Sequence, residues 1–215
     1  MTPPISPKRR LVITAIACGI GFLIIGLLVS SAWLTGIETG WVKTVAGWRS
    51  PALTSVMQGV TWLGTAWFEL PFVLIVVGVL WYRRRAGEGI RYFLWGLGGW
   101  AMYAVLKLMF HRARPKGIPR LSGAGWHSFP SGHAMLAPIL FVFAAALVTA
   151  EPRLRRFRVP ALALTWLVSC LLAFSRVYLG VHYPTDVVAG LLAGSAWLAL
   201  SLAFTGSSPA PAMID

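Results

Sequence analysis

Six long hydrophobic runs dominate the chain, and short polar segments separate them. The runs cover residues 11–34, 66–82, 90–111, 132–150, 159–180 and 183–205. A helix needs roughly 20 predominantly apolar residues to cross about 30 Å of hydrocarbon. The pattern therefore predicts an all-α integral membrane protein with six transmembrane helices.

Segment 35–65, between the first two runs, has a different pattern. Trp41, Trp48 and Trp62 are spaced among glycine, threonine and valine residues. Indole rings favour the interface between water and lipid. This segment is therefore predicted to form one or two short helices that lie on the membrane surface.

The composition agrees with a membrane protein. Of the 215 residues, 57% are hydrophobic and 12% are charged, and the mean hydropathy is +0.73, which excludes an ordinary soluble domain. A cleaved signal peptide is the alternative for the first run, with residues 30–32 as a conceivable cleavage region. We favour a membrane helix because the run exceeds the apolar core of a signal peptide, which has about 7–15 residues.

The distribution of charge predicts the orientation in the membrane. A net charge of +13 would suggest nucleic-acid binding in a soluble protein. Most of the cations here lie instead in three clusters: Lys8, Arg9 and Arg10; Arg83, Arg84, Arg85 and Arg91; and Arg153, Arg155, Arg156 and Arg158. The clusters occupy the amino terminus and every second loop, as the positive-inside rule expects of cytoplasmic segments. We expect a protein of the cell (inner or plasma) membrane with no nucleic-acid partner.

This orientation defines the domain organisation. Residues 1–10 and 206–215 are expected to be cytoplasmic tails of a single six-helix membrane domain, residues 11–205. Segment 35–65 becomes a short extracytoplasmic helical segment, and residues 112–131 and 180–183 lie on the same outer side.

Polar and ionisable residues that could take part in a reaction gather at the ends of four runs. Such groups are costly at a membrane boundary unless they are paired or functional. They follow runs three and five and begin runs four and six. Because successive helices cross in alternate directions, these four ends share one face, which the charge distribution makes the extracytoplasmic one.

His182 and Asp186 are the candidate nucleophile and its partner. Residues four apart on a helix lie on the same side, one turn from each other. The carboxylate can keep one ring nitrogen protonated and leave the lone pair of the other free to attack. A structural salt bridge is the alternative interpretation.

Ser131, Gly132 and His133 are expected to begin a helix, where free backbone N–H groups and the helix dipole attract anions. His133 would then be placed to protonate a leaving oxygen. A simple helix cap is the alternative.

Lys107, Arg114 and Arg176 supply positive charge that matches the charge on phosphoryl oxygens during transfer. Contact with lipid headgroups is the alternative for cations at these ends. That alternative fits three neighbours better: Arg112, Lys116 and Arg120.

The acidic residues predict that no metal or cofactor takes part. The chain has six of them: Glu38, Glu69, Glu88, Glu151, Asp186 and Asp215. A two-metal phosphatase needs a cluster of carboxylate and histidine ligands, which these scattered residues do not readily provide. Glu69 is expected to reach the membrane surface rather than line the site, and His111 and His127 to be interfacial or supporting residues.

The candidate residues form three ordered motifs: Lys107-x6-Arg114-Pro115, Pro130-Ser131-Gly132-His133 and Ser175-Arg176-x5-His182-x3-Asp186. This set resembles the signature of the type-2 phosphatidic acid phosphatase superfamily, in its bacterial membrane branch, and every position of the signature is filled. The resemblance extends over residues 11–205.

The resemblance implies a role for each signature residue. His182 would attack phosphorus to form a phosphohistidine, Asp186 would orient it, and His133 would protonate the leaving group. The remaining residues would bind the phosphate without a metal: Lys107, Arg114, Ser131, Gly132 and Arg176.

The resemblance also implies the reaction, which is hydrolysis of a lipid phosphate or diphosphate in the bilayer. Undecaprenyl diphosphate, phosphatidylglycerophosphate and phosphatidic acid remain open as substrates. A lipid A phosphatase and a lipid-to-lipid phosphotransferase are the enzymatic alternatives. Non-enzymatic lipid-phosphate binding or transport is disfavoured, because binding requires cations but neither a nucleophile nor an acid.

Overall fold

The computed structural model describes residues 5–31, 34–125 and 127–205, and these ranges contain helices and no strand. The helices are α1 (Pro7–Ser30), α2 (Thr35–Ala46), α3 (Pro51–Trp62), α4 (Ala66–Tyr82), α5 (Ala86–Phe110), α6 (Gly132–Ala137), the π-helical η1 (Pro138–Val142), α7 (Phe143–Val148), the 3-10 helix η2 (Pro152–Phe157), α8 (Arg158–Tyr178) and α9 (Pro184–Phe204). The all-α prediction is thereby confirmed. The expected tail 206–215 and part of the expected tail 1–10 lie outside the described residues.

Several helices have the length and composition that a membrane span requires. Four segments meet both conditions: Pro7–Ser30, Ala86–Phe110, Pro152–Tyr178 and Pro184–Phe204. A fifth is added if α3 and α4, which meet at a bend of 48°, form one span, and Gly132–Val148 is apolar but shorter. The protein is therefore a membrane protein with four to five clear candidates for a span, and each of the six predicted runs overlaps a helical segment.

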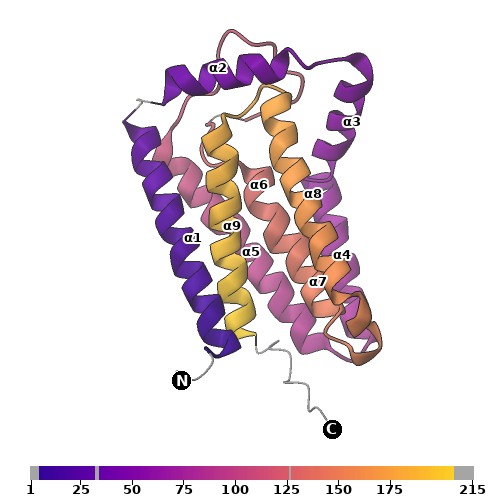
Figure 1. The fold of residues 1–215 in the computed structure, drawn as a ribbon. Helices are drawn as coiled ribbons and strands as arrows, with labels where there is room; N and C mark the ends of the chain where they lie inside the picture. Colours follow the sequence, from indigo (N-terminus) through magenta and orange to yellow (C-terminus); the bar gives the residue numbers. More distant parts are fainter. Residues whose placement is uncertain (1–4, 32–33, 126, 206–215) are drawn as a thin grey trace.

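The short helical segment Gly132–Val148, which comprises α6, η1 and α7, is buried because it lies at the centre of the bundle. Figure 1 shows α6 and α7 surrounded by α5, α8 and α9, with α1 packed along α9. All residues from Ala134 to Phe143 are buried. A helix covered on every side is hydrophobic all round, which explains the continuous apolar sequence of this segment.

The two ends of the bundle differ in character. At one end lie the beginning of α1, the α4–α5 connection with the first turns of α5, and η2 with the first residue of α8. These segments carry the three cationic clusters. At the other end α2 lies across the bundle and contacts α8 and α9 (Figure 1). The end of α5, the beginning of α6, the end of α8 and the beginning of α9 all point toward this end. The four polar helix ends therefore share one end of the molecule, as predicted.

Glycine allows α9 to approach α6 very closely. A Cβ atom added at Gly190 would lie 2.7 Å from the backbone oxygen of Ser131, and one at Gly194 would lie 2.2 Å from that of Met135. Small residues at helix contacts permit such backbone proximity in membranes. The contact fixes the beginning of α6, which carries part of the candidate site, against α9.

We expect Gly194→Ala to lower stability, because its methyl group would meet the Met135 backbone rather than a side chain that can move. The cost should be about 1–3 kcal/mol, measured as a lower melting temperature of the detergent-solubilised protein. Gly78→Ala is the matched control in α4, since nothing lies within 4 Å of its added Cβ. Equal melting temperatures for the two variants would contradict this packing argument.

Candidate active site

His182 lies in the turn that precedes α9, next to Asp186 in the first turn of that helix. The expectation that both residues share a helix was wrong, because α9 begins at Pro184. The contact forms because the carboxylate folds back over the helix start. Its Oδ2 atom accepts hydrogen bonds from the backbone N–H of Tyr183 at 2.9 Å and from His182 Nδ1 at 3.3 Å.

The surroundings of the carboxylate determine where the imidazole proton lies. Asp186 Oδ2 also accepts from the Ser128 hydroxyl, and Oδ1 accepts from Arg112 Nη1 at 2.5 Å. An ionised carboxylate has no proton to donate, so Nδ1 of His182 carries the proton in this contact. The lone pair of the neutral ring is therefore on Nε2, as a nucleophile requires.

Arg114 lies directly beside that lone pair. Its Nη1 atom is 3.2 Å from His182 Nε2 and donates to the carbonyl of Val181 at 2.6 Å, while its Nε donates to Gly125 at 2.7 Å. The two carbonyl groups hold the buried guanidinium in one position. A phosphoryl group in contact with Nε2 would consequently meet a fixed cation.

Burial keeps the imidazole neutral. It lowers the pKa of His182 to about 4, against the opposing effect of Asp186, and the charges of Arg114 and Arg176 lower it further. Since the ring is protonated only below its pKa, His182 is neutral at physiological pH. The nucleophile therefore needs no deprotonation before it attacks.

We expect nitrogen NMR of ¹⁵N-histidine-labelled protein to show His182 neutral, with its proton on Nδ1, at every pH from about 8 down to about 5. Protonation should begin only as the pH approaches 4, because the charged ring would have to be buried. His182→Ala assigns the signal. Titration of this signal near pH 6.5, the usual value for histidine, would contradict the expectation.

Arg176 reaches the site from the end of α8. Its Nη1 atom donates to Thr61 Oγ1 at 2.6 Å and to Ser122 Oγ at 3.1 Å, and Nη2 donates to the Gly123 carbonyl at 3.2 Å. The guanidinium is therefore held by α3 and by the loop between α5 and α6.

Ser131, Gly132 and His133 begin a helix, as the sequence predicts. Ser131 is the N-cap of α6, and its backbone N–H donates to the Asp186 carbonyl at 3.0 Å. The Tyr103 ring packs so closely on Gly132 that an added Cβ would lie 2.8 Å from it. The Lys107 ammonium group also contacts the Tyr103 ring, with Nζ 5.1 Å from the ring centre.

Three of these residues bury polar atoms that lack a hydrogen-bond partner. Within the described ranges such atoms occur on four side chains: Glu69 Oε1, Ser131 Oγ, His133 Nε2 and Arg176 Nε. Arg176 and Lys107 lie close enough to His133 for their charges to act on its ring. Because buried polar atoms are nearly always paired, the free donors on Ser131 and Arg176 fit a polar anionic ligand bound beside the His133 imidazole.

Sequence reasoning missed three members of the site. Arg112, expected to face lipid headgroups, is buried with 8% of its side chain exposed and pairs with Asp186 and with Glu38 of α2. That expectation was wrong. Ser128 and Glu38 were not identified, because no spacing links Glu38 to residues that lie more than 70 positions further along the chain.

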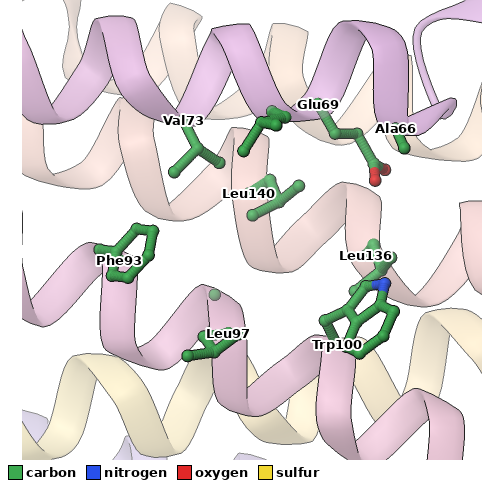
Figure 2. A pocket seen from close by; sticks show the side chains of 10 residues that line it. Ala66, Glu69, Val73, Phe93, Leu97, Trp100, Leu136 and Leu140 are labelled. Atoms are coloured by element: carbon green, nitrogen blue, oxygen red, sulfur yellow. The ribbon is translucent and has the colours of Figure 1, made fainter.

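Glu69 also differs from expectation. The side chain is half-buried, with Oε1 fully buried, and it lines a pocket of about 250 Å³ between α4, α5 and α6, among apolar side chains that include Trp100 and Leu136 (Figure 2). The rings of His111 and His127 pack on each other, with their centres 4.7 Å apart.

Comparison with known proteins connects this arrangement to a family. Residues 89–208 match the model of the PAP2 superfamily. The chain is 32% identical over 174 residues to phosphatidylglycerophosphatase B of Bacillus subtilis, covering 80% of this chain and 85% of that protein. It is 37% identical over 88 residues to an undecaprenyl-diphosphatase of Sulfolobus acidocaldarius, covering 39% of this chain and 36% of that protein.

A solved structure is similar over nearly the whole chain. It is the crystal structure of a transmembrane PAP2-type phosphatidylglycerolphosphate phosphatase from Bacillus subtilis. The TM-score is 0.85 at 29% sequence identity, and the match covers 90% of this chain and 96% of that one. The helical arrangement described above is therefore one that a phosphatase uses.

Proposed function

Because this chain belongs to the PAP2 superfamily, we propose that it is a membrane lipid phosphatase that acts through a phosphohistidine on His182. The observation that carries the proposal is the orientation of the imidazole. Asp186 holds the proton on Nδ1, and Nε2 faces the Arg114 guanidinium at 3.2 Å. A neutral nucleophile beside a fixed cation is the arrangement that attack on a phosphate ester requires.

In the first step, the Nε2 lone pair of His182 attacks phosphorus and forms an N–P bond. The bond from phosphorus to the lipid oxygen breaks, and that oxygen departs with its electron pair. His133, which would take up a proton once the anionic phosphate group is bound beside it, gives this proton to the oxygen, so that the lipid leaves as an alcohol, or as a lipid phosphate from a diphosphate.

In the second step, water replaces the enzyme on phosphorus. The neutral His133 takes a proton from the water as its oxygen attacks, and the N–P bond breaks with its electron pair returning to His182. The net reaction consumes one water and produces the dephosphorylated lipid and phosphate. Both histidines return to their initial protonation states.

Side-chain cations and polar groups at the site would hold the phosphoryl oxygens through both steps. The unpartnered atoms on Ser131 and Arg176 are donors available to them. Planar guanidinium groups suit the equatorial oxygens of the transition state. We propose Lys107, Arg114, Arg176, Ser131 and the Gly132 amide for this role, with no metal or cofactor.

Phosphatidylglycerophosphate is our first candidate substrate. The relative and the solved structure that match most of this chain are both phosphatases of this lipid. Undecaprenyl diphosphate is the second candidate, supported by a relative that matches a shorter stretch.

We further propose six membrane spans, with α4 and the Gly132–Val148 segment completing the four clear candidates. The three cationic clusters lie at the end of the bundle opposite the site. The positive-inside rule then places both termini in the cytoplasm and the site at the extracytoplasmic face of the cell membrane, beneath α2.

A substrate panel tests this function. Purified protein in detergent, with chelator present, should release phosphate from phosphatidylglycerophosphate faster than from undecaprenyl diphosphate, phosphatidic acid or lipid A. A faster rate on another lipid would reassign the substrate, and a new phosphorylated lipid in place of free phosphate would indicate a phosphotransferase. If the protein released no phosphate from any of the four lipids, the proposal would be overturned.

A further inference from the structure

Three buried charged side chains form a continuous line from α2 to the active site. Arg112 lies in the middle, donating from Nη2 to Glu38 Oε2 and from Nη1 to Asp186 Oδ1. The exposed side-chain fractions are 5% for Glu38, 8% for Arg112 and 0% for Asp186. Such charges are costly to bury unless they are paired, so each depends on its neighbour.

The line is also anchored to the first turn of α9. Glu38 Oε1 accepts from the backbone N–H of Thr185 at 2.9 Å and from its hydroxyl at 2.6 Å. Arg112 Nη1 donates to the same hydroxyl at 2.9 Å, and its guanidinium lies 4.2 Å from the centre of the Tyr183 ring. Glu38 and Arg112 therefore hold the short stretch between His182 and Asp186 in place, Glu38 through Thr185 and Arg112 through Tyr183 and Thr185.

The two oxygens of Asp186 have different partners. Oδ2 faces His182, Ser128 and the Tyr183 backbone, whereas Oδ1 is bound by Arg112. Rotation of the carboxylate about its last side-chain bond would move both oxygens together. The Arg112 contact to Oδ1 therefore opposes the same rotation that the bonds to Oδ2 oppose, and it helps to keep Oδ2 directed at the imidazole.

We propose that Arg112 and Glu38 are positioning residues that act through Asp186, so that α2 forms part of the support of the nucleophile. The proposal rests on the proposed function, in which Asp186 orients His182. In this role neither residue touches the substrate. Their loss should therefore lower kcat and leave KM nearly unchanged, because the transition state alone depends on the imidazole orientation.

The first test measures kcat and KM for Arg112→Met, Arg112→Lys and Glu38→Gln on short-chain phosphatidylglycerophosphate in detergent. We expect kcat to fall about 10- to 100-fold for Arg112→Met, as for other partners that orient a functional histidine. Lysine keeps the positive charge but lacks the planar guanidinium group that can bind two carboxylates at once. Arg112→Lys should therefore lower kcat less than Arg112→Met does. Glu38→Gln keeps an acceptor for Thr185 but presents an amide to Arg112, and should lose about as much as Arg112→Lys.

The Asp186→Asn background separates positioning from a structural role. If Arg112 and Glu38 act through the Asp186 carboxylate, then Arg112→Met and Glu38→Gln should cause little further loss of kcat in a protein that already carries Asp186→Asn. Undiminished losses in that background would overturn the proposal. Arg85→Met and Glu88→Gln are the matched controls, since that pair forms a similar 2.7 Å ion pair at the opposite end of the bundle.

A second measurement does not depend on activity. Nitrogen NMR should show His182 of the wild type with its proton on Nδ1, and Arg112→Met should shift the population toward protonation on Nε2. An unchanged tautomer in Arg112→Met would overturn the proposal even if the protein hydrolysed none of the lipids tested. Failure of the proposed function would instead appear as an inactive wild type with a normal tautomer shift.

Discussion

Phosphate release should fall by at least about 10⁴-fold when His182 is replaced by alanine. The substitution removes the atom that bonds to phosphorus, and loss of a nucleophile can cost about 10⁶-fold in other enzymes with a covalent intermediate. The cations would still bind the lipid phosphate, so affinity for the substrate should persist. The measurement is phosphate release under saturating substrate, with the melting temperature recorded for each protein.

The matched control for this substitution is His127→Ala. That ring packs on His111 and makes no hydrogen bond to Asp186 in the described structure. We expect its effect to stay below about tenfold. Comparable activities of His182→Ala and His127→Ala, with both proteins folded, would remove His182 from the chemistry.

Replacing Asp186 by asparagine should lower kcat by about 10⁴-fold, as when an aspartate that fixes a catalytic imidazole is neutralised. The amide can donate as well as accept, so it no longer requires the proton to stay on His182 Nδ1. It also leaves Arg112 without one of its two buried carboxylates. We therefore expect a lower melting temperature together with the loss of activity.

Ser201→Ala is the control for Asp186→Asn on the same helix. Ser201 is buried and donates to the Trp197 carbonyl in the last turns of α9, which ends at Phe204, whereas the site lies at the beginning of this helix. Its loss should affect stability slightly and kcat hardly at all. If Asp186→Asn retained more than about a tenth of the wild-type kcat, the carboxylate would have no role in orienting the nucleophile.

The positions of the helices could be predicted because a helix that crosses the bilayer needs a long apolar run, and such runs are easily recognised in the sequence. The run at 66–82 coincides with α4, and segment 35–65, predicted to form one or two short helices, contains α2 and α3. The segment Gly132–Val148 shows the limit of that pattern. Its unbroken hydrophobicity reflects enclosure by other helices, and hydropathy does not distinguish enclosure by protein from contact with lipid.

The candidate site could be predicted only where residues are close in sequence. His182 and Asp186 do meet, although through the capping geometry of a helix start rather than through helical spacing. Arg112 was misjudged because a cation next to a membrane span has the same sequence signature whether it faces lipid or a buried carboxylate. Its partner Glu38 could be found only from the packing of α2 against the bundle.

Trapping of a phosphoenzyme tests the central claim most directly. Wild-type protein mixed with ³²P-labelled phosphatidylglycerophosphate and quenched within milliseconds in alkali should carry label that is stable to base and labile to acid, as a phosphohistidine is. Peptide mapping should place the label on His182, and His182→Ala should carry none. Label on another residue, or rapid hydrolysis by the wild type without any labelled protein, would contradict the account.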